Sequence, residues 1–210
     1  MNPNRTSVLP QVPASHYFGT KYDNLVRFCS YWHQIDETLK LNPSKVLEVG
    51  IGSGLVNERL RHYGLDAQTL DIAADLHPDL VGSVTNIPAN DGAYEVAICC
   101  QVLEHLPYDQ FIKALKELRR IASKGCIISL PDARRLIKIE LSMPRIGNRH
   151  LLVNLPTRAR QVPFNGEHYW EIGWKGATLA IVKKDISSVF KIINDYRALG
   201  NPYHHFFILQ

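Results

Sequence analysis

The chain has 210 residues, of which 45% are hydrophobic and 21% are charged, and its formal net charge is +4. This length allows one α/β domain that buries most of its apolar surface without disulfides or a structural metal. The apolar share excludes an intrinsically disordered chain.

The first predicted element is an amphipathic segment that follows the aromatic run from His16 to Tyr22 and ends near Leu39. Beyond it, four apolar runs bounded by turn residues recur at intervals that leave room for helices, which predicts a parallel sheet. The apolar runs are Lys45–Val49, Ala67–Leu70, Val96–Cys100 and Cys126–Leu130, and the helical patterns between them are Leu55–His62 and Tyr108–Ile121.

The second helix has the more informative pattern, because its apolar residues share one face, as in a helix that packs on a sheet. These residues are Phe111, Leu115, Leu118 and Ile121. The dipeptide Lys124-Gly125 predicts the end of this helix, since a basic last turn and a glycine at positive φ are typical of helix C-termini.

The C-terminal part of the chain predicts two more strands, Phe190–Tyr196 and His204–Leu209, with the turn Gly200-Asn201-Pro202 between them. A connection this short favours an antiparallel hairpin. The sequence shows no internal repeat and no low-complexity segment, so we expect one domain.

The four cysteines have no CxxC spacing, and we therefore expect reduced, buried thiols in a cytoplasmic protein. No stretch approaches the roughly 18 apolar residues that a membrane span requires. Residues 1–13 are polar and proline-rich, unlike a signal peptide. The sequence thus predicts neither a membrane span nor secretion.

Positive charge is concentrated between Asp132 and Asn165. Seven basic residues minus two acidic ones leave a surplus of five positive charges, which can attract an anionic acceptor, a nucleic acid or a membrane surface. A solvated basic face is an equally weighted alternative. The basic residues are Arg134, Arg135, Lys138, Arg145, Arg149, Arg158 and Arg160, and the acidic ones are Asp132 and Glu140.

Residues 45–54 form a predicted buried strand that runs into three glycines and then a helix. Glycines in this position let a ligand approach the backbone closely. Nicotinamide- and flavin-binding folds also use a glycine-rich turn, but their G-x-G-x-x-G fingerprint would require a glycine at position 55, which is Leu55. The run resembles instead the E/D-x-G-x-G-x-G motif of S-adenosylmethionine enzymes, with Glu48, Gly50, Gly52 and Gly54 matching it.

Asp71 lies at the end of the following predicted strand and is followed by Ile72. An acidic side chain there can accept two hydrogen bonds from ribose hydroxyls. Taken alone, an aspartate at a strand end is more often a helix cap or a turn former. Combined with the glycine motif, the ribose interpretation is favoured.

Residues 82–106 resemble the type-11 subgroup of class I methyltransferases, whose run is roughly G-D-x-x-x-L-P-F, then F-D-x-V, then L-E-H. The corresponding pieces are Gly82–Pro88, Tyr94–Ala97 and Leu103–His105, and with Arg120-Ile121 and Lys124-Gly125 the resemblance covers positions 45–130. It implies a Rossmann-like, doubly wound, mostly parallel seven-stranded sheet that ends in a C-terminal antiparallel hairpin. It also implies binding of S-adenosyl-L-methionine and release of S-adenosyl-L-homocysteine.

The resemblance further implies roles for residues around the cofactor. The backbone at Ser83 and Val84 and the side chain of Ile87 would frame the adenine ring, and Gln101 would lie under the methionine end. Ser83 stands where the family commonly has the aspartate that receives the adenine amino group, so adenine would be held differently here. Glu95 replaces another family aspartate and is expected to be structural.

Tyr17 and Tyr22 lie in a segment that resembles the N-terminal lid of these enzymes, where either could bond the cofactor carboxylate or simply pin a helix to the core. The expected organisation is a single domain. It comprises lid helices (1–40), the cofactor-binding core (41–131), an acceptor-side insertion (132–170), and a C-terminal helix and hairpin (171–210).

A methyl transfer to a hydroxyl requires a base, and histidine titrates near neutral pH. The candidate bases are His168 and His105. For His105 the structural alternative is a histidine at a helix start that bonds backbone. Metal-dependent catechol-type transfer needs a carboxylate cluster that the sequence does not place, so we expect no metal.

The sequence lacks the features of two other classes of methyltransferase. The D/N-P-P-Y/F motif of amino-methylating nucleic-acid enzymes is replaced by Gln101-Val-Leu-Glu, and Asn201-Pro-Tyr203 falls in a terminal turn. Base-carbon methylation needs a reactive thiolate, whereas Cys99 and Cys100 lie in a predicted buried strand.

We therefore expect methyl transfer to a small-molecule or glycan-precursor acceptor, with a hydroxyl as the receiving group. A nucleic-acid methyltransferase and a non-catalytic module that keeps the cofactor fold are the alternatives. The sequence does not indicate which oligomeric state the chain adopts.

Overall fold

A computed structural model of the chain describes residues 12–145, 147–164 and 166–210, so parts of the predicted lid (1–40) and insertion (132–170) lie outside the described residues. Its centre is a seven-stranded sheet in the order β3-β2-β1-β4-β5-β9-β8, in which only β9 is antiparallel to its neighbours. The strands are β1 (Lys45–Val49), β2 (Asp66–Asp71), β3 (Leu80–Val81), β4 (Tyr94–Cys100), β5 (Ala122–Pro131), β8 (Ile192–Ala198) and β9 (Asn201–Leu209).

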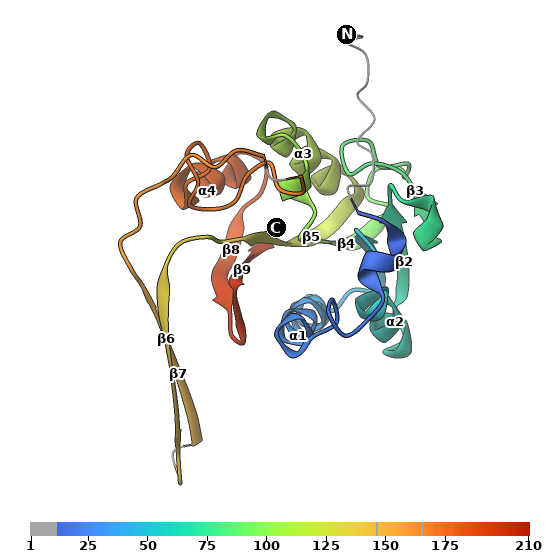
Figure 1. Cartoon of the computed structure of the whole chain (residues 1–210). Coiled ribbons are helices and arrows are strands. Elements are labelled where there is room, and N and C mark those ends of the chain that lie inside the picture. The colour runs from blue at the N-terminus through green and yellow to red at the C-terminus, as the bar shows by residue number, and fades with distance from the viewer. Residues whose placement is uncertain (1–11, 146, 165) are drawn as a thin grey trace.

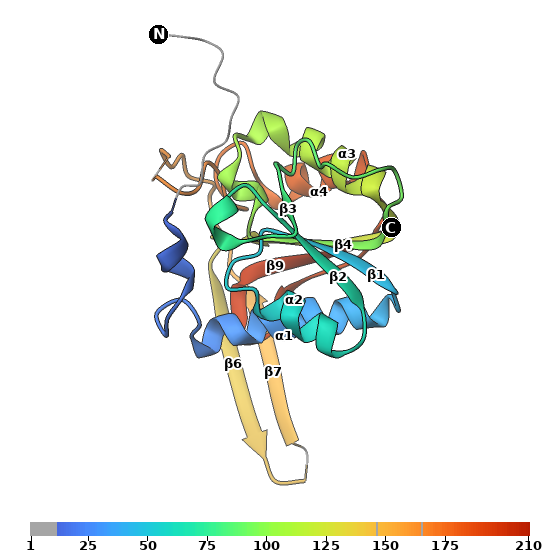
Figure 2. The ribbon, with the colours of Figure 1, turned by 90° about the vertical axis from the view of Figure 1, so that its right-hand side faces the viewer.

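Helices cover both faces of this sheet (Figures 1 and 2). They are α1 (Leu25–Lys40) and α2 (Leu55–His62) on one face, and α3 (Phe111–Ile121) and α4 (Leu179–Ser187) on the other. Short 3-10 turns are η1 (Ala14–Tyr17), η2 (Ala74–Leu76), η3 (Leu103–His105) and η4 (Tyr108–Gln110). The predicted doubly wound fold with its C-terminal hairpin is thus confirmed.

Alternate residues of the buried strands explain the two layers. In β4, Ala97 and Cys99 pack toward α3 and α4, whereas Val96 and Ile98 pack toward α1 and α2. Because both faces are covered, the strands are almost continuously apolar, which is the pattern of a parallel sheet. The predicted apolar face of α3, from Phe111 to Ile121, is fully buried as expected.

The predicted end of the helix at Ile121 is confirmed, but the role predicted for Lys124-Gly125 as its C-terminal signal is wrong. The helix ends at Ile121, and Lys124 and Gly125 already belong to β5. A Cβ on Gly125 would collide with the carbonyl oxygen of Leu209 in β9, so this glycine permits close strand approach and does not terminate a helix. Lys124 instead pairs with Glu95 at 2.9 Å, which agrees with the structural role expected for that carboxylate.

The segment after β5 contains a hairpin that the sequence analysis did not predict. Strands β6 (Leu136–Met143) and β7 (Gly147–Asn154) pair with each other only and project from the body of the molecule (Figures 1 and 2). One face of this ribbon carries exposed apolar residues, among them Ile137, Ile139 and Leu151.

Among the described residues, no helix combines the length and the apolar character that crossing a membrane requires.

A buried ion network fixes the point where the chain leaves β5. Asp132, whose side chain is fully buried, accepts hydrogen bonds from Arg134 at 2.6 Å and from His205 at 3.0 Å. Arg197 donates to the backbone carbonyls of Asp132 and Arg134 and to the side chain of Asn154, so it ties both ends of the β6–β7 hairpin to β8. The hairpin is therefore anchored at its base only.

Asp132→Asn is expected to lower the free energy of unfolding at pH 7 by about 3 to 5 kcal/mol, because it leaves buried cations without their anion. Burial opposes ionisation of Asp132, but the hydrogen bonds from His205 and Arg134 and the charge of Arg197 lower its pKa to about 2. A depressed pKa stabilises the fold above the ordinary pKa of 3.8, and this stabilisation is lost as the pH falls toward 2.

Urea unfolding between pH 7 and pH 2.5 measures both effects. The stability of the wild type should fall more steeply below pH 4 than that of the variant. Glu140→Gln, which removes the partner of the exposed Lys138, is the matched control and should have little effect. Equal stability of the Asp132→Asn chain and the wild type would contradict the role of the network.

Candidate active site

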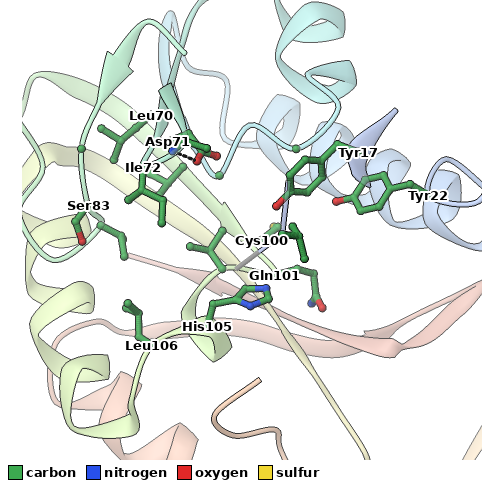
Figure 3. Close-up of a pocket in the computed structure, with 18 residues that line it drawn as sticks. Tyr17, Tyr22, Leu70, Asp71, Ile72, Ser83, Cys100, Gln101, His105 and Leu106 are labelled. Carbon is green, nitrogen blue, oxygen red and sulfur yellow. Dashed lines mark hydrogen bonds between the residues drawn. The ribbon is translucent and has the colours of Figure 1, made fainter. Parts of the chain in front are cut away.

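The carboxyl ends of β1, β2 and β4 meet at one edge of the sheet, where ligands of open parallel sheets bind. A cavity at this edge brings together ten of the fourteen predicted site residues (Figure 3). They are Tyr17, Tyr22, Gly50, Gly52, Asp71, Ile72, Ser83, Val84, Gln101 and His105. We call this the glycine-side cavity.

The turn after β1 supplies its backbone wall. Gly50 adopts φ +83° and Gly52 φ +53°, which L side chains rarely adopt. A Cβ on Gly50 would also overlap the side chain of Val102. Gly54 caps α2 and shapes the turn, but it does not line the cavity. The motif therefore brings two of its three glycines to the ligand space.

Asp71, at the end of β2, is positioned by backbone amides. One carboxylate oxygen accepts from Ile51 N–H at 3.0 Å and the other accepts from Ala73 N–H at 2.8 Å. Burial raises the pKa of Asp71, although these amides oppose the shift. A carboxylate has about four acceptor sites, so Asp71 can still accept hydrogen bonds from a ligand.

The predicted adenine segment is only partly at the cavity. Ser83 and Val84 line it, and the Ser83 hydroxyl is hydrogen-bonded to Thr85 at 2.9 Å. Ile87 does not line it, because its side chain is buried in the core and its N–H donates to Glu117 at 2.9 Å. The expectation that Ile87 frames a ligand is therefore corrected.

Glu48 lies under the glycine turn in a smaller adjoining pocket, which is also lined by Arg27, Tyr31 and Gln101. Burial raises the pKa of Glu48 to about 8. One of its carboxylate oxygens has no hydrogen-bond partner among the residues that the structure describes. Glu48 can therefore contribute to a site from below, not from the wall of the glycine-side cavity.

Tyr17 and Tyr22 close the cavity on the side of the N-terminal segment (Figure 3). Their rings meet edge to face at 5.1 Å, and the guanidinium of Arg27 lies 3.9 Å from the centre of the Tyr22 ring. Burial raises the pKa of Tyr17 to about 12, so its hydroxyl stays protonated at neutral pH. The two rings thus pack against each other and also face the ligand space.

Gln101 follows β4 and lines the glycine-side cavity and both neighbouring pockets. It adopts φ +58°, which is unusual for a residue with a side chain. Its backbone N–H donates to the Ser129 carbonyl at 2.9 Å, and its side-chain amide donates to the Ser129 hydroxyl at 3.2 Å. The adjacent Cys100 is only half-buried, contrary to expectation, but burial raises its thiol pKa to about 12, so it remains a thiol.

A second cavity opens beside the first and is lined by Glu104, His105 and His168, and also by Tyr17, Tyr22 and Gln101 of the first cavity. We call it the histidine-side cavity. Both histidine rings are oriented through Nδ1. In His105 this nitrogen donates to the Glu167 carbonyl at 3.0 Å, and in His168 it donates to the Glu171 carboxylate at 2.9 Å.

The pKa values of the two histidines are shifted in opposite directions. Burial and the nearby His168 lower the pKa of His105. Burial also opposes protonation of His168, but its hydrogen bond to Glu171 and the charge of Glu104 raise its pKa. His105 is therefore neutral at pH 7 and, of the two candidate bases predicted from the sequence, has the more available proton-accepting form.

Tyr169 and Trp170 of the predicted insertion do not line the histidine-side cavity. Trp170 is buried, donates to the Leu106 carbonyl at 3.1 Å and packs on Tyr108 and Phe111. Tyr169 is exposed and stacks on Phe164. In the described residues, none of the seven basic side chains of the predicted insertion lines any of the three cavities. The expected attraction of an anionic acceptor by this surplus is therefore not supported.

Four further residues line the histidine-side cavity that were not predicted from the sequence: Glu104, Arg27, Tyr203 and His204. Glu104 was within the L-E-H motif, and that motif was the only available signal for it. His204 comes from β9, and its side chain is buried with a pKa lowered to about 3 by burial and by Arg27. No local pattern connects these residues, since they meet only through the order of the strands.

Residues 47–130 match the family model described as a methyltransferase domain. The ubiquinone biosynthesis O-methyltransferase of Xanthomonas campestris pv. campestris (strain B100) is 27% identical to the chain, in a match that covers 51% of this chain and 56% of the relative. The chain thus spans little more than half the length of this relative.

Two solved structures have a similar fold at low sequence identity. An S-adenosylmethionine-dependent methyltransferase from Clostridium acetobutylicum ATCC 824 has a TM-score of 0.61 and 11% identity, with 94% of this chain and 99% of that chain covered. The 1,6-didemethyltoxoflavin-N1-methyltransferase of Burkholderia thailandensis, solved with 1,6-didemethyltoxoflavin and S-adenosylhomocysteine, has a TM-score of 0.57 and 12% identity, with 93% and 84% covered.

Gly50→Ala is expected to destabilise the chain more than Gly64→Ala. Both glycines have φ near +84°, at +83° and +85°, but only a Cβ on Gly50 meets another atom. The backbone strain is therefore shared, and overlap with Val102 should add about 1 to 3 kcal/mol. Thermal and urea unfolding measure the difference, and adding Val102→Ala to Gly50→Ala should recover the overlap part. Equal losses in the two single variants would contradict it.

Proposed function

We propose that the chain is a class I, type-11 methyltransferase, as the match of residues 47–130 to a methyltransferase domain supports. It binds S-adenosylmethionine and transfers the methyl group to a hydroxyl of a small-molecule or glycan-precursor acceptor. The observation that carries the proposal is the contact between the two cavities. Tyr17, Tyr22, Gln101 and His105 line both of them, so a ligand in the glycine-side cavity adjoins one in the histidine-side cavity.

The residues of the glycine-side cavity fit this cofactor. Gly50 and Gly52 leave a backbone cradle that a Cβ would fill or strain. Asp71 is a carboxylate held in place by two amides and is suited to accept from ribose hydroxyls. Ser83 and Val84 would border adenine, and Gln101 would lie at the methionine end beside the pocket of Glu48 and Arg27.

When bound, S-adenosylmethionine supplies a methyl group on a sulfonium whose leaving group is already activated. The chain must then hold the acceptor in line and remove its proton. In the simplest form of this step, an imidazole of the protein accepts the proton of the acceptor hydroxyl while the hydroxyl oxygen bonds to the methyl carbon. His105 is suited to this role because it is neutral at pH 7 and its Nδ1–H is committed to a carbonyl.

The hydroxyl acceptor is supported by two observations. The relative from Xanthomonas is named as an O-methyltransferase, and an oxygen acceptor needs the proton-handling groups found in the histidine-side cavity. No observation favours a nucleic acid, because the surplus basic residues lie away from the cavities. The free cysteines fit the cytoplasmic location expected from the sequence.

Asp71→Ala should weaken S-adenosylmethionine binding at least about tenfold, because a charged partner of ligand hydroxyls is typically worth about 1.5 to 3 kcal/mol. Calorimetric titration measures this, with one cofactor per wild-type chain expected. Asp75→Ala removes an exposed neighbouring carboxylate and is the matched control. Binding of NAD in place of S-adenosylmethionine and its demethylated product would overturn the proposal, and unchanged affinity in a folded Asp71→Ala chain would remove Asp71 from the site.

His168→Ala should leave the dissociation constant of S-adenosylmethionine within about threefold, which is less than 1 kcal/mol. It should lower methyl transfer about a hundredfold, because the acceptor step loses a group that positions or deprotonates the hydroxyl. His105→Ala should have a comparable effect on turnover. Once a screen finds an acceptor, kcat and KM can be compared with those of the surface variant His62→Ala. Wild-type kcat in both cavity variants would refute the role of the histidines.

A further inference from the structure

We propose that Glu104, His105 and His168 form a binding site for a divalent transition-metal ion in the histidine-side cavity. Their potential ligand atoms all lie within 4.8 Å of one another. No metal was expected, because the sequence does not place a carboxylate cluster. Glu104 and His168 are 64 positions apart, and only the fold brings them together. Two imidazoles and one carboxylate are the donor set of open catalytic zinc sites and of related first-row metal sites.

The spacing is close to that of a formed site. Ligand atoms about 2.0 to 2.2 Å from one ion can be at most about 4.4 Å apart. The observed upper limit of 4.8 Å therefore requires only small side-chain rotations. Such rotations are possible beside an open cavity, whereas the backbone of this region is fixed by the hydrogen bond from Tyr169 N–H to the Glu104 carbonyl at 2.9 Å.

Glu104 is the strongest indication of a cation. Its side chain is fully buried, yet neither carboxylate oxygen has a hydrogen-bond partner among the described residues. Buried charges in proteins are normally paired, hydrogen-bonded or bound to metal. Because Glu104 lines the histidine-side cavity, an ion there would supply the direct partner that its carboxylate oxygens do not find among the described residues.

The partners of the two histidines match those of metal ligands. Metal-binding histidines usually donate their second ring N–H to a carboxylate or a backbone carbonyl, which fixes the tautomer. Here Glu171 accepts from His168 and the Glu167 carbonyl accepts from His105, each through Nδ1. The nitrogen that would ligate is therefore Nε2 in both rings.

The charges around the cluster also favour a cation. Glu104 and Glu167 line the cavity and Glu171 bonds to His168, while the only arginine among the lining residues is Arg27. Arg27 itself is directed over the ring of Tyr22. Three carboxyl groups and one guanidinium therefore surround the cluster, so acidic side chains outnumber the arginine there.

The ion would change how the acceptor is activated, and this part rests on the proposed function. His105 and His168 would act as ligands and not as bases. An acceptor hydroxyl bound to the ion would become more acidic. Its proton would leave to water, its oxygen would bond to the methyl carbon, and the carbon–sulfur bond electrons would remain on sulfur.

Zinc binding to the chelator-treated chain of 210 residues tests the site. Equilibrium dialysis should find one Zn²⁺ per chain, with a dissociation constant of about a micromolar or below. Bound Zn²⁺ should raise the melting temperature, and Co²⁺ should give a visible absorption spectrum of a low-coordinate site. Glu104→Gln should lose this binding and yet melt no lower than the wild type without metal, because it removes an uncompensated buried carboxylate.

The surface pair His150 and Glu140, 3.3 Å apart on the hairpin, provides the control for adventitious binding. The double variant Glu140→Gln/His150→Ala should keep the stoichiometric Zn²⁺ site, and His168→Ala should lose it. Undiminished binding in Glu104→Gln, or no saturable site in the wild type, would overturn the metal proposal. Titration of the metal-free chain with S-adenosylmethionine separates the two ideas, since cofactor binding without zinc binding refutes the metal site alone, and the reverse refutes the proposed function alone.

Discussion

The parallel pairing of β1, β2 and β4 is the constraint on which the rest of the site depends. Parallel strands end at the same edge, and the chain must leave the hydrogen-bonded ladder there. At this edge Gly50 and Gln101 adopt positive φ, and Asp71 accepts hydrogen bonds from two backbone amides. Each departure presents backbone or polar atoms to one shared cavity, so ligand space is a direct consequence of strand direction.

Two buried carboxylates give this edge its electrostatic character. Burial raises the pKa of Glu48 to about 8 and that of Glu104 to about 7. Each lies in a different pocket, and both pockets adjoin Gln101. A cationic group or ion that enters either pocket stabilises the ionised carboxylate, so the region is arranged to favour positive charge at two separate points.

Local sequence patterns predicted the features that local structure determines. The strand, three glycines and helix around Gly50 form one continuous segment, and Asp71 ends the next strand, so spacing was sufficient to find them. Ile87 was assigned to the ligand because the sequence does not reveal which way an apolar side chain near a motif points. The meeting of Glu104 with His168 and His204 depends on the placement of β9 and of the segment after the hairpin, which no local period encodes.

The β6–β7 hairpin is connected to the rest of the molecule at its base. Its strands pair only with each other, and its two ends are held by Arg197, which is bonded to Asn154 and to the carbonyls of Arg134 and Asp132. Asp132 is followed by Ala133, whose N–H bonds to Ile172, one residue after the Glu171 that orients His168. Arg197 therefore links the base of the hairpin to β8, and the Ala133–Ile172 hydrogen bond links the same base to the segment that carries Glu171.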